Sequence, residues 1–468
     1  MKSADIDIVI MAAGKGTRMK SNLPKVLHKL AGRALLQHVM DAATALQPRS
    51  VITITGHGAP EVIAAHAHFK KASSGFEQIF VNQEPQLGTG HAAQQALPKL
   101  HGEGITLILN GDVPLIETAT LRKLVDACAG RQLALLTVEC GDPSGYGRIV
   151  RRGDAVQAIV EHKDATPEQR QIQEWYSGIM AAPTAQLKRW LANLRSDNSQ
   201  GEFYLTDIVQ MAVQDGTGCV AVKTGDGLQV AGVNSPVQLA ALERAYQLRL
   251  AQQLLEDGVR LADPARLDVR GRLACGQDVG IDVNCVFEGE VSLADGVQVG
   301  ANCVIANARI GAGTVIYPFT HIDGEKLGAS VGAGARIGPF ARLRPGAVLG
   351  DEVHIGNFVE VKNSTMAKGA KANHLAYLGD ATVGERVNYG AGSITANYDG
   401  ANKYRTVIEA DVHVGSNCVL VAPVTIGAGG TVGGGSTITK STAPGALSVA
   451  RGKQVSIAGW TRPVKEKK

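Results

Sequence analysis

The chain has 468 residues, of which 44% are hydrophobic and 19% charged, and its formal net charge is +4. So small a charge, with only 4% aromatic residues, gives no reason to expect a nucleic-acid partner. The seven scattered cysteines form no CxxC pair, which predicts reduced thiols in a cytoplasmic protein. No window reaches the roughly 18 apolar residues of a membrane span and no signal peptide is recognisable, so we expect neither membrane insertion nor export.

A short apolar run, Ile6 to Met11, leads directly into the glycine-rich stretch AAGKGTR at residues 12–18. A buried strand followed by such a turn is typical of an α/β domain with a parallel sheet. The turn lacks the third glycine of GxGxxG and the GK[ST] ending of a Walker A loop. It therefore suits two interpretations: an anion-binding loop with Lys15, Arg18 and Lys25 as its cations, or a plain strand-to-helix turn.

Further strands and helices alternate along the chain, with strands at 51–55 and 105–110 and helices at 60–71 and 118–129. This βαβ order predicts a doubly wound, Rossmann-like sheet whose ligand crevice lies at the carboxyl ends of the strands. Asp112 follows one of these strands. A carboxylate there suits a Mg²⁺–phosphate complex, because Mg²⁺ usually takes one or two protein carboxylates and completes its shell with phosphate and water. A turn residue or helix cap is the alternative for an isolated aspartate.

A helix is predicted after Ser235-Pro236, because a hydroxyl cap followed by proline at the first helical position is a typical start. Leucines then recur at helical spacing. Such an apolar stripe would suit a partner-binding helix, but more often it packs on its own protein. We therefore expect a linker helix at 237–257 between a first domain at 1–236 and a second domain at 258–468.

The second domain is dominated by an apolar residue at every sixth position. This period fits neither a helix nor simple strand alternation, and it is typical of a parallel β-helix in which each hexad forms one short strand and a turn. Glycines follow many of these residues, including Gly332, Gly338, Gly350 and Gly356, and we expect them to occupy the tight corners. The apolar positions include Ile281, Phe287, Leu293, Val299, Ile305, Val331, Ile337, Leu343, Leu349, Ile355, Val361, Ile408, Val414, Leu420, Ile426, Val432 and Ile438.

Polar segments interrupt the hexads at 362–380 and 396–405, and loops of this kind are usually retained for a site. His374 is a candidate general base, since imidazole titrates near the working pH of most enzymes. A hydrogen-bonded turn histidine is the alternative. A further hypothesis is a zinc site for hydration chemistry, because three histidines and an open position suffice for catalytic zinc. Its candidate ligands are His321, His354, His374 and His413.

Seven pieces of the sequence, in this order, resemble the sugar-nucleotide pyrophosphorylases: AAGKGTRM (12–19), LPKVLH (23–28), QLGTGHA (86–92), GDVPL (111–115), GYGRIV (145–150), VEHKDAT (160–166) and GVN (232–234). With the hexads, essentially the whole chain resembles one bifunctional bacterial family. Its members are both N-acetylglucosamine-1-phosphate uridyltransferases and glucosamine-1-phosphate N-acetyltransferases.

The resemblance implies that acetyl-CoA first acetylates glucosamine 1-phosphate. The resulting N-acetylglucosamine 1-phosphate then reacts with UTP to give UDP-N-acetylglucosamine and pyrophosphate. UDP-N-acetylglucosamine would be a precursor for peptidoglycan and lipid A. The resemblance also implies Mg²⁺, a left-handed β-helix, and a cytoplasmic homotrimer whose acetyl-transfer sites are shared between chains. The alternative is a monofunctional pyrophosphorylase with a structural or regulatory β-helix.

Carried over residue by residue, the resemblance assigns ligands to each half of this chain. The nucleotide and the sugar nucleotide would be bound by Met11, Ala12, Ala13, Gly14, Lys25, Gln83, Gly88, Thr89, Asn110, Gly111, Asp112, Gly147, Glu161, Tyr176 and Asn234, with Asp112 and Asn234 holding Mg²⁺. Glucosamine 1-phosphate would be bound by Arg344, Lys362, Tyr377 and Asn388, with His374 as the base. Acetyl-CoA would be bound by Ala391, Asn397, Tyr398, Ser416, Gly434 and Arg451.

Two of these positions depart from the family. Tyr176 stands where the family has asparagine, and a phenol donates one hydrogen bond but cannot reproduce both faces of an amide. Gly434 stands where many relatives have alanine, which matters little for a backbone contact.

Overall fold

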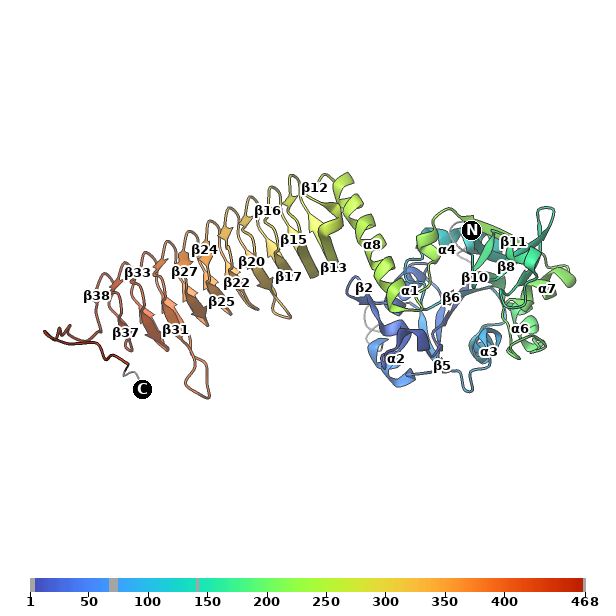
Figure 1. Ribbon diagram of the computed structural model, residues 1–468, viewed down its shortest axis with the longest axis horizontal. Helices are drawn as coiled ribbons and strands as arrows, with labels where there is room; N and C mark the ends of the chain where they lie inside the picture. Colours follow the sequence, from blue (N-terminus) through green and yellow to red (C-terminus); the bar gives the residue numbers. More distant parts are fainter. Residues whose placement is uncertain (1–4, 67–74, 140–142, 466–468) are drawn as a thin grey trace. The chain divides into compact units, whose positions relative to one another are not determined.

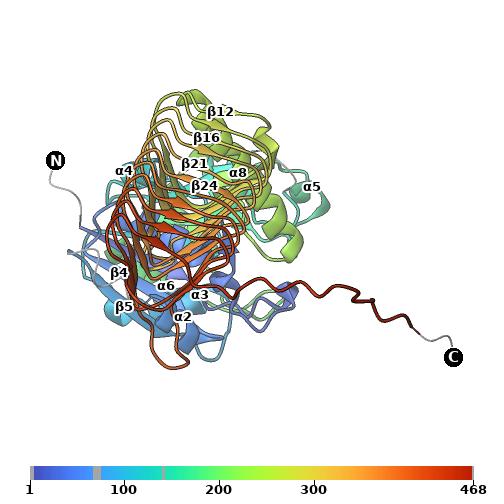
Figure 2. The ribbon, with the colours of Figure 1, turned by 90° about the vertical axis from the view of Figure 1, so that its left-hand side faces the viewer.

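The computed structural model describes residues 5–66, 75–139 and 143–465. The chain divides into two compact units, Met1–Tyr246 and Gln247–Lys468 (Figures 1 and 2). No helix in the described ranges is both long and apolar enough to cross a bilayer. The six described cysteines are free thiols.

The first unit is built on a nine-stranded sheet whose main path runs β11-β7-β10-β6-β1-β4-β5. Its strands are β1 (Ile6–Met11), β4 (Ser50–Thr55), β5 (Glu77–Asn82), β6 (Ile105–Asn110), β7 (Leu133–Val138), β8 (Arg148–Arg152), β9 (Ala155–Val160), β10 (Trp175–Pro183) and β11 (Cys219–Thr224). A separate hairpin joins β2 (Lys29–Leu30) to β3 (Arg33–Ala34). The strands predicted at 6–11, 51–55 and 105–110 are confirmed.

Helices cover both faces of this sheet. They are α1 (Leu35–Thr44), α2 (Ala59–His66), α3 (Thr89–Gln95), α4 (Thr118–Cys128), α5 (Pro167–Arg170), α6 (Thr184–Ala192) and α7 (Asp207–Gln214). One apolar core joins α1, α2 and α4 to the sheet, and the other joins α3, α6 and α7 to its opposite face. The helix expected at 60–71 is observed as α2, and residues 67–71 of that prediction lie outside the described residues.

The prediction of a parallel sheet is wrong for the part formed by β8, β9 and β10. β10 runs antiparallel to both β6 and β7, and β8 pairs antiparallel with β9 and β10. The chain enters β10 after the antiparallel hairpin β8–β9, and Trp175 pairs with Arg148 of β8. A tight hairpin reverses the chain, whereas a parallel neighbour needs a long crossover. The sequence rhythm of strand and helix does not carry this information.

The division between the units falls within α8 (Pro236–Glu256). Its start matches the predicted signal, since the Gln238 backbone N–H donates to Ser235 Oγ at 3.3 Å. It ends before Gly258, whose φ of +92° lies in the left-handed region that favours glycine at a helix end. The predicted helix is confirmed.

The second unit is a parallel β-helix whose coils follow one another along the solenoid (Figure 1). One face consists of β12 (Arg260–Leu261), β14 (Gly280–Ile281), β16 (Gln298–Val299), β18 (Val315–Ile316), β21 (Arg336–Ile337), β24 (His354–Asn357), β27 (Lys371–His374), β30 (Asn388–Tyr389), β33 (His413–Val414), β36 (Thr431–Val432) and β38 (Leu447–Ser448).

The other strands form one continuous 16-stranded sheet. It starts with the long strands β13 (Leu267–Cys275), β15 (Cys285–Leu293) and β17 (Val304–Ile310). One row then continues through β19 (His321–Asp323), β22 (Arg342–Leu343), β25 (Glu360–Lys362), β28 (Tyr377–Gly379), β31 (Ile394–Ala396), β34 (Val419–Val421) and β37 (Thr437–Ile438). The other row continues through β20 (Ala329–Val331), β23 (Val348–Leu349), β26 (Thr365–Met366), β29 (Ala381–Val383), β32 (Thr406–Ile408) and β35 (Val424–Ile426).

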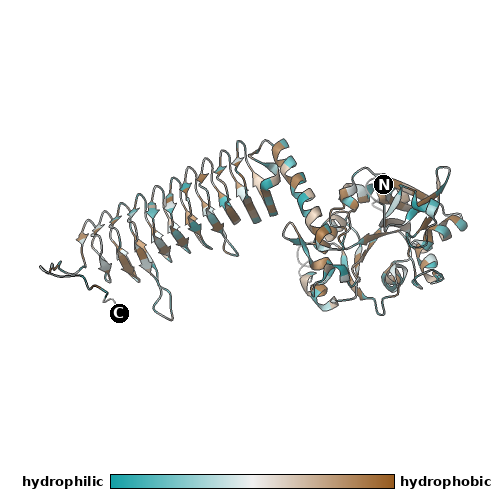
Figure 3. Ribbon diagram, viewed as in Figure 1, coloured by the Kyte–Doolittle hydropathy of each residue, from teal (hydrophilic) through white to brown (hydrophobic). Residues whose placement is uncertain are grey.

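The strand register explains the six-residue period. Arg336 pairs with His354 and Ile337 with Ile355, so one coil takes 18 residues, or three hexads. All the apolar positions predicted from the period are buried and form one core along the solenoid. Where the offset grows to 25 residues, between Asn388 and His413, the extra residues project as the loop after β31, which is hydrophilic (Figure 3).

Gly332, Gly338 and Gly350 lead from a strand into a turn, as expected, whereas Gly356 lies within β24 and not at a corner. Gly338 has φ +102°, but Gly332, Gly350 and Gly356 are absent from the positive-φ residues. They allow close stacking instead: a Cβ on Gly332 would lie 2.4 Å from the Gly350 carbonyl carbon, and one on Gly356 would lie 1.9 Å from the Asn373 oxygen. Glycine is required here because the neighbouring coil approaches the backbone too closely for any side chain.

Candidate active sites

Two adjoining cavities lie at the carboxyl ends of β1 and β6 in the first unit. Their volumes are about 620 Å³ and 360 Å³, and Met11, Thr89, Asn110 and Asp112 line both. This is the edge at which a doubly wound sheet is expected to bind its ligand.

The larger cavity lies between two loops, residues 13–17 after β1 and residues 83–89 after β5. Gln86 Nε2 donates to the Ala13 carbonyl at 2.5 Å, and Gln83 Nε2 donates to the Gly88 carbonyl at 3.0 Å. These two glutamines therefore hold the loops in shape. The predicted nucleotide residues that line this cavity are Met11, Ala13, Gly14, Lys25, Gln83, Gly88, Thr89, Asn110 and Asp112.

The two predicted Mg²⁺ ligands, Asp112 and Asn234, converge on one point. The Lys25 ammonium donates to the Asp112 carboxylate and, at 3.1 Å, to Asn234 Oδ1. A carboxylate oxygen and an amide oxygen are donors that Mg²⁺ accepts, and one protein carboxylate is enough when phosphates complete the shell. The residues therefore fit the ion.

The smaller cavity lies between β8, β9 and β10. Of the predicted residues it gathers Met11, Thr89, Asn110, Asp112, Gly147, Glu161, Tyr176 and Asn234. Glu161 Oε1 accepts a hydrogen bond of 2.9 Å from the Thr206 hydroxyl. Burial raises the pKa of Glu161, partly offset by this hydrogen bond, and Asp164 adds to the rise. Ala12 and Gly111 line neither cavity.

Tyr146 and Thr206 also line the smaller cavity and were not predicted. The Tyr146 ring stacks on Trp175 with the centroids 4.1 Å apart, which fixes the turn that carries Gly147. The motif GYGRIV contains Tyr146, so the signal was available; Thr206 carries no recognisable signal in the sequence.

Tyr176, which the resemblance places where the family has asparagine, is one of the residues that line the smaller cavity. The residue is 7% exposed, and its ring belongs to the apolar core on that face of the sheet. Among the described residues the Tyr176 hydroxyl has no hydrogen-bond partner. Burial, together with the nearby Glu161 carboxylate, raises its pKa well above the usual value. The phenol is therefore neutral, and its hydroxyl hydrogen is not donated to any described residue.

In the second unit, predicted residues from distant hexads fall into one column along the solenoid, which we call the His374 column. Backbone hydrogen bonds run from the residue after one member to the member of the preceding coil: Gly392 N donates to His374 O at 3.3 Å, Asn417 N to Ala391 O at 2.7 Å, and Gly435 N to Ser416 O at 2.8 Å. Arg451 closes the series by donating to the Gly434 carbonyl at 2.8 Å. The column thus comprises His374, Ala391, Ser416, Gly434 and Arg451.

A second group, the cationic cluster, surrounds the end of β25. Lys362 lies beside Lys403, and contact with that ammonium, followed by burial, lowers the pKa of Lys362. Arg344 Nη1 donates to Glu360 Oε1 at 2.9 Å. Asp380, which is buried, accepts a hydrogen bond from Asn397. Two adjacent ammonium groups and a guanidinium are suited to a dianionic phosphate.

Lys403 was not predicted as a site residue. It comes from the loop inserted after β31 and pairs with Tyr398. Its proximity to Lys362 depends on the path of that loop, which no periodicity specifies. Tyr398 itself is 60% exposed, and Asn388 lies on the other face, paired with Lys371 and His413. Tyr377 pairs with Glu360 and so belongs with the cationic cluster.

The zinc hypothesis is contradicted, since no three histidine, cysteine, aspartate or glutamate side chains within residues 5–66, 75–139 and 143–465 converge as metal ligands do. His354 and His413 are separated from His321 because they lie on a different face of the solenoid.

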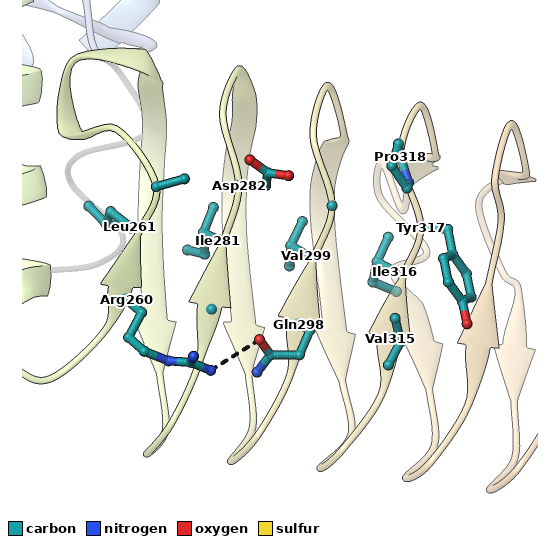
Figure 4. Close-up of a pocket in the computed structure, with 13 residues that line it drawn as sticks. Arg260, Leu261, Ile281, Asp282, Gln298, Val299, Val315, Ile316, Tyr317 and Pro318 are labelled. Atoms are coloured by element: carbon teal, nitrogen blue, oxygen red, sulfur yellow. Dashed lines mark hydrogen bonds between the residues drawn. The ribbon is translucent and has the colours of Figure 1, made fainter.

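A third cavity, of about 420 Å³, lies on the first coils of the solenoid (Figure 4). Its visible polar contact is a hydrogen bond of 3.2 Å from Arg260 Nη2 to Gln298 Oε1. No predicted site residue lines it.

The two halves thus define a nucleotidyltransferase domain joined to a hexapeptide-repeat transferase. Residues 8–197 match the MobA-like NTP transferase domain, and residues 328–363 match the bacterial transferase hexapeptide in six repeats. Bifunctional protein GlmU of Albidiferax ferrireducens is 72% identical, covering 98% of this chain and 100% of that protein. The protein of the same name from Polaromonas naphthalenivorans is 72% identical, covering 98% of each.

The chain belongs to the family of the bifunctional GlmU proteins. This membership confirms the expected family and the expected bifunctional transferase, with a uridyltransferase half and an acetyltransferase half. Among solved structures, UDP-glucose pyrophosphorylase complexed with UDP-glucose matches with 16% identity and a TM-score of 0.43, covering 52% of this chain and 98% of that one.

Proposed function

We propose that the first unit transfers uridylate from UTP to N-acetylglucosamine 1-phosphate, and that the solenoid transfers acetyl from acetyl-CoA to glucosamine 1-phosphate. The observation that supports the pair of sites is the gathering of sequence-distant residues in each unit. The loops after β1 and β5 supply backbone donors and cations for a triphosphate, and the cationic cluster supplies charge for a sugar phosphate.

In uridyl transfer, a phosphate oxygen of the sugar phosphate attacks the α-phosphorus of UTP and pyrophosphate leaves. Both reactants are anions, so the site must position them and neutralise their charge. Lys25 and the amides of residues 13–17 bind the phosphates, and the smaller cavity orients the sugar through Glu161 and Tyr176. Mg²⁺ held by Asp112 and Asn234 would supply further charge neutralisation on the phosphate oxygens.

In acetyl transfer, the amine of glucosamine 1-phosphate attacks the thioester carbonyl. A neutral His374 accepts a proton from the amine as the new C–N bond forms. The C–S bond then breaks, and the proton passes from the imidazolium to the departing thiolate. Free thiol and N-acetylglucosamine 1-phosphate are released, and the imidazole is neutral again.

We further propose that the chain acts in the cytoplasm as a homotrimer with left-handed solenoids, as the family resemblance implies. A supporting observation is a row of exposed apolar side chains at one corner of successive coils: Phe319, Phe340, Phe358 and Leu375 are 51%, 47%, 56% and 63% exposed. Large apolar residues that are exposed together are typical of a surface covered in an assembly.

The test is to measure thiol release and pyrophosphate release on the same preparation. His374→Ala should lower thiol release by about 10² or more while pyrophosphate release is retained. Chelation of divalent cations from the wild-type protein should lower pyrophosphate release while thiol release is retained. If chelation leaves uridyl transfer intact, or if His374→Ala leaves acetyl transfer intact, the corresponding assignment is wrong.

A further inference from the structure

The His374 column continues one coil further back, to a residue that no motif singles out. His374 Nδ1 lies 3.0 Å from Asn357 Oδ1. The two residues are paired in register between β24 and β27. Asn357 is half-buried, and its carboxamide is the side-chain partner of the imidazole.

We propose that Asn357 is the positioning residue of the acetyl-transfer base. The inference rests on the proposed role of His374. A carboxamide oxygen can only accept, so Nδ1 must carry the hydrogen. In a neutral imidazole the lone pair is then on Nε2, which is the nitrogen left to take a proton from the substrate amine. Asn357 thus selects the tautomer and fixes the plane of the ring.

The neutrality of Asn357 matters as much as its geometry. A carboxylate in its place would stabilise the imidazolium and raise the pKa of His374, so that less of the free base would be present near neutral pH. A neutral acceptor orients the ring without this effect. An amide oxygen therefore suits a base that must be unprotonated before the reaction starts.

The backbone around Asn357 is held on both sides. Gly356 lies directly against the backbone of Asn373, where any Cβ would be 1.9 Å from the carbonyl oxygen. Phe358 stacks on Phe340 with the ring centroids 5.3 Å apart. The Leu375 N–H donates to the Asn357 carbonyl at 3.1 Å. The carboxamide is thus presented from a fixed point.

The other charged groups near the pair are the same residues in wild type and in the variants. His354 of β24 interacts with the charge of His374, and Arg336 and Lys371 flank His354. Burial first, and then these positive charges, lower the pKa of His354. Any difference between variants at position 357 is therefore a difference in the partner of His374.

The experiment measures thiol release by Asn357→Ala and Asn357→Asp against pH, with pyrophosphate release as the folding control. For Asn357→Ala we expect kcat for acetyl transfer to fall about tenfold or more, with KM for both substrates within about twofold of wild type. For Asn357→Asp we expect the acidic limb of the kcat profile to move up by about one pH unit, with activity recovering at higher pH.

Asn302→Ala is the matched control, because Asn302 Oδ1 also bridges neighbouring coils, accepting from Asn284 Nδ2 at 3.0 Å. If this control loses acetyl transfer as strongly as Asn357→Ala, the loss reflects coil stacking and the proposal is overturned. It is also overturned if Asn357→Ala keeps wild-type kcat, or if Asn357→Asp leaves the acidic limb unchanged. Activity retained by His374→Ala would instead overturn the base itself.

Discussion

Replacing Tyr176 with phenylalanine should change stability and catalysis in opposite directions. The ring stays, so the apolar core that includes Ile149, Ile159 and Met180 remains filled. The hydroxyl, which has no partner among the described residues, is removed. Leaving a buried polar group unsatisfied costs about 1–3 kcal/mol. The variant should therefore be more stable than wild type without ligand, by about 1 kcal/mol.

The same change should weaken recognition of the sugar. If the Tyr176 hydroxyl donates to the sugar in the smaller cavity, Tyr176→Phe loses one neutral hydrogen bond, worth about 0.5–1.5 kcal/mol. This corresponds to a kcat/KM for N-acetylglucosamine 1-phosphate that is lower by about twofold to twelvefold. KM for UTP should be unchanged, because the nucleotide cavity does not include Tyr176.

The assays are urea unfolding of the unliganded protein and pyrophosphate release at varied concentrations of each substrate. Tyr176→Asn introduces the residue that the resemblance implies for this position, and this variant tests hydrogen bonding without the ring. A variant Tyr176→Phe that is less stable than wild type, or whose kcat/KM for the sugar phosphate is unchanged, would refute the reasoning. In the first case the hydroxyl has a partner in the free protein, and in the second it does not meet the sugar.

Two further predictions concern charged groups. Asp7→Ala should destabilise the first unit by about 3 kcal/mol at pH 7, since buried Asp7 accepts from Arg49 at 2.8 Å. Burial opposes the ionisation of Asp7, but hydrogen bonds led by that from Arg49 lower its pKa. The difference in unfolding free energy between wild type and Asp7→Ala should therefore be complete above the ordinary pKa of aspartate and should disappear as the pH falls through the lowered pKa of Asp7. Urea unfolding midpoints of both proteins at several pH values measure this difference. A difference that does not change with pH would contradict the prediction. Lys403→Ala should raise KM for glucosamine 1-phosphate about tenfold without changing KM for acetyl-CoA. It should do so less at high salt, and an equal rise in both KM values would mean the loop has merely unfolded.

The elements best predicted from the sequence were those with a period or a sharp boundary. The strand at Ile6–Met11 ends where the apolar run meets glycine, and the hexads give the buried positions of the solenoid, although only the strand register shows that three hexads make one coil. The antiparallel direction of β10 was not predicted, because a buried strand has the same apolar sequence pattern whether it runs parallel or antiparallel to its neighbours. The role of Gly356 was predicted wrongly, since the sequence shows that a side chain is absent but not which neighbour excludes it.

Site residues were predictable only where a motif carried them. Lys403 lies in a loop whose path sets its distance to Lys362, and that path follows from tertiary packing. Asn357 could not be predicted for a different reason. Its proposed role depends on the strand register that places it beside His374, 17 residues further along the chain. Whether Tyr176 meets a ligand depends on which way its hydroxyl points, and a substitution alone does not reveal that direction.

Because the coils stack evenly, the distance between two residues along the solenoid is fixed by the number of coils between them. Neighbouring strands lie about 4.8 Å apart, so the three steps from His374 through Ala391 and Ser416 to Gly434 measure about 14 Å. Lengthening a coil by a loop, as after β31, leaves this distance unchanged, because the extra residues leave the stack sideways. Only adding or removing a whole coil would alter it. Under the proposed function, in which acetyl-CoA lies along this column, the length available to the bound molecule is set by the number of coils and does not depend on the length of the loops.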